Sequence, residues 1–201
     1  GDILSDEASM LTGSIGMGKS TTAALFAAQG VPIWDADAVV HQLYGLNGGA
    51  VEPLRAVIPQ AIQNDTVDRL LLRKALLGDP TLMKQVEAIV HPLVATDREV
   101  FVENTAAPII LFDIPLLFET GQAQAYDSVV VVSAPADVQR DRVLARPGMT
   151  EPTFEAILAK QMPDAEKRAK ADFVIDTSRG IDAARTQVQA ILDSIRGSDH
   201  A

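Results

Sequence analysis

The stretch GSIGMGKST combines residue types that together can hold a phosphate chain. Gly13 and Gly18 are separated by four residues, and Lys19 and Ser20 follow at once, which completes the pattern G-x-x-x-x-G-K-[ST]. Glycines let successive backbone N–H groups turn toward one anion, and a helix from Lys19 to about Gln29 would point its positive end at that anion. The stretch therefore predicts a nucleotide site in which Lys19 reaches the β- and γ-phosphates and Ser20 ligates Mg²⁺.

Two other interpretations of this stretch are less well supported. A glycine-rich turn before an ordinary helix would need no ligand, but the full pattern arises by chance in only roughly one chain in a hundred of this length. A dinucleotide-binding fingerprint would need a third glycine, and Thr21 stands at that position. Phosphate-loop chemistry is the interpretation that the residues favour.

Carboxylates follow two of the predicted strands. Asp35 and Asp37 come after the run 31–34, where a carboxylate can accept a proton from a hydroxyl nucleophile or orient it. One of the two can instead cap the next helix, and we choose Asp37 as the base. Asp113 closes the run PIILFD in the manner of a Walker-B carboxylate that holds Mg²⁺ through water. The alternative for Asp113 is a turn before Pro115.

Composition limits the partners that this chain can have. A net charge of −10 over 201 residues argues against binding to nucleic acid or to an anionic membrane, because both depend on an excess of Lys and Arg. The absence of cysteine excludes disulfides, thiolate metal sites and a cysteine nucleophile. No apolar run approaches the ~20 residues of a membrane span, and the first residues, GDILSDE, are set aside as a leader. We therefore expect a cytoplasmic protein with small-molecule substrates.

Short apolar runs alternate with helical patterns, which is typical of an α/β protein with a parallel sheet. Near-continuous apolar runs such as PIILF and SVVVV indicate strands covered by helices on both faces, and such sheets bind ligands at the carboxyl ends of their strands. The first strand should be short, because Ser5, Asp6 and Glu7 leave only Met10 and Leu11 as apolar residues beside the loop. The other predicted strands are 31–34, 108–112, 128–133 and 172–175.

An inserted helical region interrupts this alternation between Gly45 and Thr105. It contains the helical patterns VDRLLLRKALL and DPTLMKQVEAIV, and Asp79 with Pro80 opens the second of these as a cap and first-turn pair. His91 precedes Pro92 at an expected break between two helices. There it is either a ligand-binding residue or a capping or packing residue.

A basic segment from about residue 140 to 170 stands out in this acidic chain. Its position favours a lid over the nucleotide, and the alternative is a solvated helix face with i,i+4 ion pairs. Its basic residues are Arg140, Arg142, Arg146, Lys160, Lys167, Arg168 and Lys170.

Taken together, these segments resemble the dephospho-coenzyme A kinase family over nearly the whole chain. LTGSIGMGKST, DAD, VDRLLLRKALL, IVHPLV and DIPLLFE occur in the family's order and at its spacings. The resemblance implies a P-loop kinase core with a five-stranded parallel sheet flanked by helices, an inserted helical substrate domain and a helical lid. Within one domain over residues 1–201, the core would be about 8–45, 105–139 and 171–197, the insertion about 46–104 and the lid about 140–170.

The resemblance also implies a reaction and a set of residues. ATP, with Mg²⁺, would phosphorylate the ribose 3′-hydroxyl of dephospho-coenzyme A in the last step of coenzyme A synthesis. Catalysis would rest on Asp37, Lys19 and Arg146, with Ser20 and Asp113 at the metal. ATP would be bound by Gly13, Gly16, Met17, Gly18, Lys19, Ser20 and Thr21. The substrate side would be lined by Asp37, Arg69, Arg73, His91, Leu116 and Leu117.

Two features depart from the family pattern, and rival functions stay open. The first strand lacks the usual apolar residues, and Thr177 follows Asp176 where an Asn is usual, so the adenine contacts are not predicted. The nearest rival is another phosphate-loop kinase, acting on a nucleoside monophosphate or a sugar acid. A GTP-dependent switch would need N-K-x-D and D-x-x-G, and the sequence contains neither.

Overall fold

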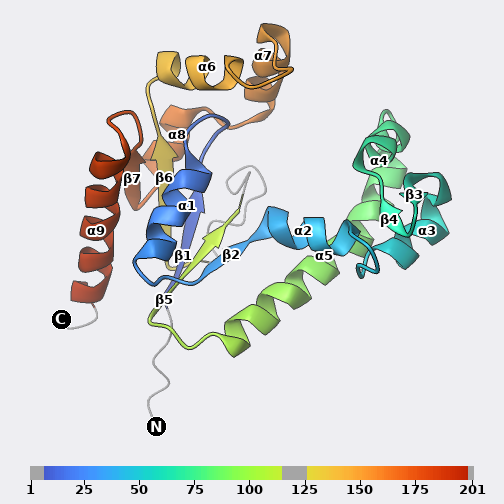
Figure 1. Ribbon diagram of the computed structural model, residues 1–201, viewed down its shortest axis with the longest axis horizontal. Coiled ribbons are helices and arrows are strands. Elements are labelled where there is room, and N and C mark those ends of the chain that lie inside the picture. The colour runs from blue at the N-terminus through green and yellow to red at the C-terminus, as the bar shows by residue number, and fades with distance from the viewer. Residues whose placement is uncertain (1–6, 115–125, 199–201) are drawn as a thin grey trace. The chain divides into compact units, whose positions relative to one another are not determined.

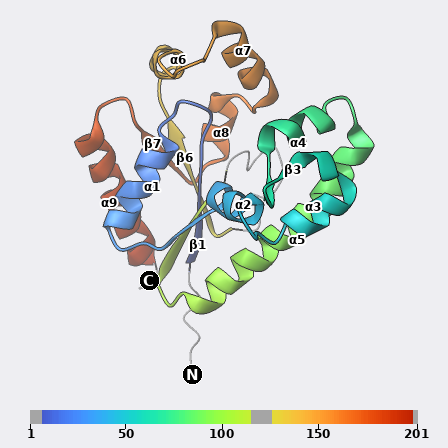
Figure 2. The ribbon, with the colours of Figure 1, turned by 45° about the vertical axis from the view of Figure 1, so that its right-hand side comes forward.

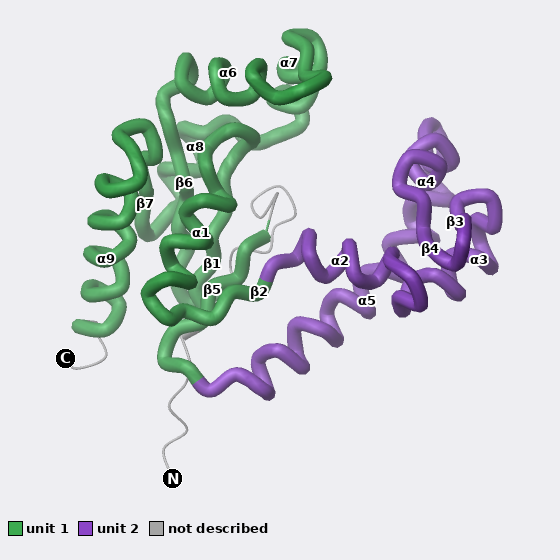
Figure 3. Tube along the Cα trace, viewed as in Figure 1, with its two compact units in different colours: residues 1–34, 107–201 green, residues 35–106 purple. Residues whose placement is uncertain are grey.

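The computed structural model describes residues 7–114 and 126–198 of the chain. The chain divides into two compact units, residues 1–34 with 107–201 (unit 1) and residues 35–106 (unit 2), coloured separately in Figure 3. Each unit has its own cluster of buried apolar side chains. Unit 2 contains the whole insertion predicted at about 46–104, and it begins earlier, at Asp35.

The centre of unit 1 is a sheet of five strands: β1 (Glu7–Thr12), β2 (Ile33–Asp35), β5 (Ile109–Asp113), β6 (Ser128–Ser133) and β7 (Phe173–Asp176). Their order across the sheet is β2-β5-β1-β6-β7. β1 pairs in parallel with both β5 and β6, and β6 pairs in parallel with β7. The predicted α/β fold with a five-stranded parallel sheet is confirmed.

The first strand is longer than the sequence led us to expect. β1 has six residues and is in register with β5 from Glu7 to Leu11. Ser9 and Thr12 are polar, yet both are buried within it. The prediction of a short strand was wrong because a central strand with a partner on each side has its backbone groups satisfied along its whole length, whatever side chains it carries.

The described helices of unit 1 are α1 (Lys19–Ala28), α6 (Ala136–Leu144), α7 (Glu151–Lys160), α8 (Asp164–Lys170) and α9 (Ile181–Ser198). α1 packs against α9, which also packs on β7, while α8 packs on β6. Figures 1 and 2 show α6 and α7 beyond the carboxyl end of β6. Phe26 of α1 and Leu192 of α9 are buried in the same core as Val130 of β6. These contacts hold the carboxyl ends of the strands in place.

Unit 2 is mainly helical, with α2 (Ala36–Tyr44), α3 (Val51–Val57), a 3₁₀ turn (Pro59–Ala61), the strands β3 (Ile62–Gln63) and β4 (Thr66–Val67), α4 (Arg69–Leu76) and α5 (Pro80–Asn104). Asp79 caps α5 as predicted, because its carboxylate accepts from the Leu82 amide at 3.0 Å. The small β3–β4 hairpin was not predicted. Asn64 and Asp65 form its turn with positive φ angles of 52° and 57°, as a two-residue hairpin requires.

The sequence Val90-His91-Pro92 does not break the helix. α5 continues through Pro92 for 25 residues in all. Our prediction of two helices was wrong because an internal proline removes one backbone hydrogen bond, and burial of Val86 and Val90 keeps the helix packed on that side. His91 is exposed in the middle of α5, so it caps no helix end. None of the helices in residues 7–114 and 126–198 is long and apolar enough to span a bilayer.

Candidate active site

The phosphate loop joins β1 to α1, and two of its glycines are required by its surroundings. A Cβ on Gly13 would lie 2.3 Å from Val132 Cγ2 and 3.0 Å from the Val132 carbonyl oxygen. Gly18 precedes α1 with φ of +89°, a conformation that side chains disfavour. α1 begins at Lys19, as predicted, so its first amides have no acceptors within the helix and are available to an anion.

Side chains from three other segments hold the backbone of the loop, and those of Gln139, Arg142 and Thr177 donate to its carbonyl groups. Across a trans peptide, an N–H points away from the carbonyl that precedes it, so the amides of Gly16 and Gly18 are aimed away from these donors. This is the arrangement that an anion-binding loop needs. The contacts are Gln139 Nε2 to Ile15 O (2.8 Å), Arg142 Nη1 to Gly16 O (3.3 Å), Thr177 Oγ1 to Met17 O (2.7 Å) and the Ile15 amide to Gln161 Oε1 (3.3 Å).

The loop lysine is paired with the carboxylate at the end of the neighbouring strand. Lys19 Nζ contacts Asp113 Oδ1, and the two side chains are 18% and 5% exposed. Asp113 ends β5, which lies beside β1 in the sheet. A carboxylate this buried needs a counter-charge, and Lys19 supplies it. The structure therefore brings together two residues that the sequence assigned to the same phosphate and metal chemistry.

The residues expected at Mg²⁺ suit an ion that takes few protein ligands. Ser20 is exposed in the first turn of α1, and Asp113 offers one buried carboxylate. Over the part of the chain that the structure describes, no three His, Cys, Asp or Glu side chains cluster as metal ligands. Mg²⁺ is usually held by one or two carboxylates together with phosphate oxygens and water. The donor set fits this ion and lacks the protein cage that a structural metal requires.

A cavity of about 390 Å³ lies beside the loop, entirely within unit 1. It has an apolar wall from Ile181 and Ala184 of α9 and a cationic wall from Arg142 and the exposed Arg146. Such a mixture of a small apolar surface and a few polar groups is usual for a nucleotide-sized ligand. Four predicted residues meet here, namely Gly16, Gly18, Thr21 and Arg146.

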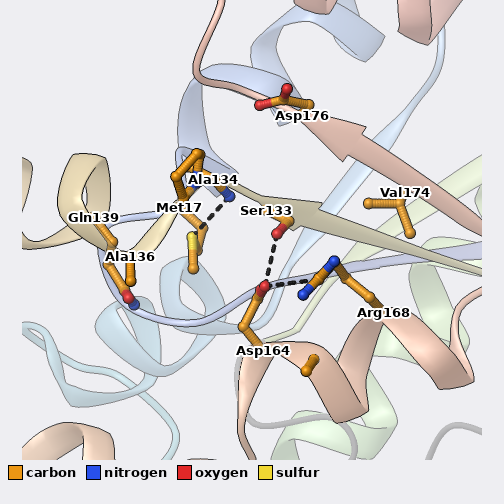
Figure 4. Close-up of a pocket in the computed structure, with 11 residues that line it drawn as sticks. Met17, Ser133, Ala134, Ala136, Gln139, Asp164, Arg168, Val174 and Asp176 are labelled. Carbon is orange, nitrogen blue, oxygen red and sulfur yellow. Dashed lines mark hydrogen bonds and ion pairs between the residues drawn. The ribbon is translucent and has the colours of Figure 1, made fainter.

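A second cavity, of about 460 Å³, lies near the carboxyl end of β6 and is shown in Figure 4. Asp164 Oδ2 accepts from Ser133 Oγ at 2.8 Å and from Arg168 Nε at 2.9 Å. Met17 Sδ accepts from the Ala134 amide at 3.1 Å, and Met17 is 1% exposed. The side chain of Met17 is therefore used to anchor the loop, and its backbone is engaged as well, because its amide donates to Ser14 O at 3.2 Å and its carbonyl accepts from Thr177 Oγ1 at 2.7 Å.

The two carboxylates of the DAD segment have different surroundings. Asp35 caps α2, since its Oδ1 accepts from the amides of Asp37 at 2.9 Å and Ala38 at 3.2 Å. Asp37 is exposed in the first turn of α2, and its carboxylate has no hydrogen bond or ion pair with any residue that the structure describes. The helix cap that we expected from one of the pair is Asp35, which leaves the charge of Asp37 available.

The predicted substrate residues of unit 2 are exposed. Arg69 and Arg73 are one turn apart on α4, so they lie on the same side of the helix. The Arg69 guanidinium lies 5.2 Å from the ring centroid of Tyr44, and burial raises the pKa of Tyr44 more than Arg69 lowers it. His91 is on α5. Leu116 and Leu117 lie outside the described residues.

Several residues of this site were missed. Arg142 was noted only as part of the basic segment, although Gln139, Arg142 and Arg146 are spaced by three and four residues, which signals one helix face. Thr177 was noted only as a departure from the family pattern, without a role in holding the loop. Gln161 gave no signal, because it is a single polar residue just beyond the end of α7. Nearby, hydrogen bonds from the Ser178 hydroxyl and amide hold the pKa of Asp176 below its ordinary value.

Comparison with known proteins gives one consistent result. The sequence profile of the dephospho-CoA kinase family matches residues 9–183. A dephospho-CoA kinase from Ruegeria pomeroyi is 55% identical over 192 residues, covering 95% of this chain and 97% of its own length. One from Cereibacter sphaeroides is 54% identical over 186 residues, covering 92% and 94%.

Solved structures show the same fold. A crystal structure of a protein from Thermus thermophilus has a TM-score of 0.84 at 32% identity, covering 94% of this chain and 97% of its own. The dephospho-CoA kinase from Campylobacter jejuni has a TM-score of 0.69 at 23% identity, covering 95% and 98%. The shikimate kinase from Acinetobacter baumannii reaches 0.52 at 18% identity, covering 96% and 95%, and is similar in fold alone.

Proposed function

The chain belongs to the dephospho-CoA kinase family, and from this membership we propose that it transfers the γ-phosphate of ATP to the ribose 3′-hydroxyl of dephospho-CoA. One observation carries the proposal. The family match over residues 9–183 includes the phosphate loop and all of unit 2, residues 35–106. Because many kinases share a phosphate loop, a match through the remainder of the chain is what favours this acceptor.

The donor half of the reaction is assigned to unit 1. Phosphoryl transfer passes through a loose transition state, so positioning and charge stabilisation do most of the catalysis. The loop amides and Lys19 bind the phosphates of ATP, and Arg142 and Arg146 supply positive charge from the wall of the adjoining cavity. Ser20 and Asp113 would hold Mg²⁺, which when bound neutralises charge on the phosphate oxygens.

The acceptor half is assigned to residues of unit 2. Asp37 has an exposed carboxylate without a partner among the described residues, so it can accept or orient the proton of the ribose hydroxyl. Dephospho-CoA also carries a diphosphate. Arg69 and Arg73, adjacent on one side of α4, offer two guanidinium groups suited to such an anion. His91 on the same unit is a further candidate for the substrate side.

We also propose that the basic segment 140–170 acts as a lid, and that the reaction takes place in the cytoplasm with small molecules as the only substrates. Two arginines of the basic segment are in ion pairs, Arg140 with Glu151 and Arg168 with Asp164. Arg142 and Arg146 instead line the cavity beside the loop. The segment therefore has positively charged side chains at the cavity and others that face solvent. Such a segment is suited to closing over a bound substrate.

The proposal is tested by incubating the purified protein with ATP, Mg²⁺ and dephospho-CoA, and measuring ADP release together with the mass and phosphorylation position of the product. We expect one phosphoryl group, on the 3′-hydroxyl of the ribose. AMP and shikimate serve as alternative acceptors that represent the nucleoside monophosphate and sugar-acid kinases. If AMP or shikimate were phosphorylated faster than dephospho-CoA, that compound would be the better candidate for the substrate, and the proposal would be wrong.

A further inference from the structure

We infer that Thr177 is a positioning residue for the nucleotide, because its hydroxyl joins the Arg142 guanidinium to the carbonyl of Met17 in the phosphate loop. The inference rests on the proposed function in one respect, namely that the cavity of about 390 Å³ beside the loop receives ATP. It goes beyond that function by assigning a role to a residue outside the phosphate-loop motif, which the proposed function does not use.

The Thr177 hydroxyl both donates a hydrogen bond and accepts one. A hydroxyl has one proton to donate and two lone pairs to accept with. The proton goes to Met17 O, at 2.7 Å, in preference to Ser133 O, at 3.4 Å. Arg142 Nη1 donates to the hydroxyl oxygen at 2.9 Å. The hydroxyl is thus a direct link between a cation and the tip of the loop.

Arg142 approaches Thr177 with two nitrogens of one guanidinium. Nη1 donates to the hydroxyl and also lies 3.3 Å from Gly16 O, while Nη2 donates to the Thr177 carbonyl at 2.7 Å. Two contacts to one residue fix the plane of a guanidinium, which a single contact would leave free to rotate. Arg142 and Thr177 both line the cavity. The orientation of its cationic wall is therefore set by Thr177.

Thr177 can set this orientation because its own backbone is fixed. Its amide donates to Ser133 O at the end of β6, at 2.9 Å. The preceding residue, Asp176, is held by the Gln187 amide group of α9, which bonds to its backbone N and O at 2.9 Å each. Thr177 is thereby tied to the sheet and to α9, whereas Arg142 belongs to α6 in the segment proposed as a lid. The side chain therefore joins the sheet and α9 to Arg142 and to the phosphate loop.

The methyl side of Thr177 supports the same role. Its Cβ, Cγ2 and Oγ1 atoms would each lie 3.3 Å from a Cβ added to Gly18. Thr177 is therefore packed directly against the last glycine of the loop. A valine would keep this packing and lose only the hydroxyl, which makes Thr177→Val the cleanest substitution for a test.

The test measures the dissociation constant of ATP with Mg²⁺ by titration calorimetry. We expect Thr177→Val to weaken ATP binding about tenfold, because Met17 O loses its donor and a charged hydrogen bond is lost from Arg142. Thr177→Ser keeps the hydroxyl and should stay within about twofold of the wild type. Thr186→Val is the matched control, since it removes a threonine hydroxyl bonded to the Asp182 carbonyl on the exposed side of α9, and it should have no effect.

A second comparison separates positioning from loss of structure. If Thr177 acts through Arg142, then Thr177→Val should cost little further ATP affinity in a chain that already carries Arg142→Ala. An equal loss in both backgrounds would overturn the inference, and so would unchanged ATP affinity in Thr177→Val. Should Thr177→Val not fold, Arg142→Lys gives the same test, because it keeps the charge but loses the two-point contact. Unchanged affinity in that variant would equally overturn the inference.

Turnover distinguishes this inference from the proposed function. The Michaelis constant for ATP should rise in Thr177→Val, while that for dephospho-CoA changes by less than about twofold. If the wild type binds ATP but does not phosphorylate dephospho-CoA, the proposed function fails and the binding measurements still decide the role of Thr177. If the wild type binds no ATP, both are refuted.

Discussion

The phosphate loop of unit 1 and the candidate acceptor residues of unit 2 are built in opposite ways. In the loop, carbonyls are held by Gln139, Arg142 and Thr177, and the lysine already has a buried counter-charge. In unit 2, Asp37 and Arg73 are exposed and make no hydrogen bond or ion pair with the described residues. One set of groups is fixed before any ligand arrives, and the other is free to adjust to one.

From this contrast we expect the phosphate loop and the acceptor residues of unit 2 to contribute to different steps. Groups that stabilise a transition state are most effective when they are already oriented, since no reorganisation is then needed during the reaction. Groups that recognise a large flexible acceptor can be ordered by that acceptor, at some cost in binding free energy. Substitutions in the loop should therefore reduce turnover itself, and substitutions in unit 2 should affect the use of the acceptor without changing ATP binding.

The largest effect is expected at the prepared site. Lys19→Ala should lower turnover by about 10³-fold, because it removes a charge aimed at the transferred phosphoryl group. Thermal melting should change by only a few degrees, as read by calorimetry. Lys84→Ala, on the exposed surface of α5, is the matched control.

Asp113 needs a separate control in that experiment, because Lys19→Ala leaves its buried carboxylate without this counter-charge. Adding Asp113→Asn to the variant removes that carboxylate charge and should recover any lost stability without recovering turnover. A Lys19→Ala protein that melts early yet keeps near-normal turnover when folded would show that the loop is not the prepared donor site.

The second largest effect is expected at Asp37, and it shows whether residues of the acceptor side act without affecting ATP binding. Asp37→Asn should reduce turnover by about 10²-fold, since it removes the charge that accepts or orients the proton. ATP affinity should stay near normal and stability should change by less than about 1 kcal/mol. Calorimetric titration, steady-state kinetics and thermal melting measure the three quantities.

Asp35→Asn is the matched control for Asp37, because Asn caps a helix about as well as Asp. It should leave turnover and stability unchanged. If Asp35→Asn were inactive and Asp37→Asn active, the roles of the two carboxylates would be reversed. If both variants kept full activity, neither carboxylate would be the base.

A smaller effect is expected from the proposed lid. Arg146→Ala should lower turnover about tenfold, and amides from about 142 to 170 should exchange more slowly when both substrates are bound. Arg140→Ala is the control, because Arg140 is in a surface ion pair with Glu151 and such pairs contribute little. Identical exchange with and without substrates would indicate that the segment is only a solvated helical surface.

The smallest effect concerns how the stability of the protein depends on pH through Asp176, the residue before Thr177. The pKa of Asp176 is held below its ordinary value of 3.8 by hydrogen bonds from Ser178, so its stabilising contribution is complete above that pH. The contribution is lost as the pH falls through the lower pKa of the folded state. Asp176→Asn should therefore melt earlier than the wild type near pH 7, and this difference should shrink below about pH 3. A difference that grows in acid would contradict the direction of the shift.

Much of the fold could be predicted because local patterns and tertiary structure agree. Apolar runs at 108–112 and 128–133 became the buried strands β5 and β6, and the loop glycines preceded a helix that begins at Lys19. Patterns misled where tertiary contacts outweigh local preference. β1 begins at Glu7 and has six residues, although Ser5, Asp6 and Glu7 in the sequence led us to expect a short strand, and α5 continues through Pro92.

The candidate site was predicted where residue type alone carries the chemistry, as for Lys19 and Asp113. The supports of the loop could not be found in this way. Gln139 and Gln161 lie far from Ile15 in the sequence and reach it only in the folded chain. Which of Asp35 and Asp37 caps α2 also needed the structure, because both residues have the type and the position that suit a helix cap.

The polar residues of β1 have a consequence for how the protein is made. β1 leaves the ribosome long before β5 and β6, the two strands with which it pairs. A strand that must wait without partners is a site for association between nascent chains, and isolated polar residues within it lower that tendency. Ser9 and Thr12 flank Met10 and Leu11, so the exposed apolar run is only two residues long. The first strand is thereby protected during synthesis by two polar residues that become buried once the sheet has formed.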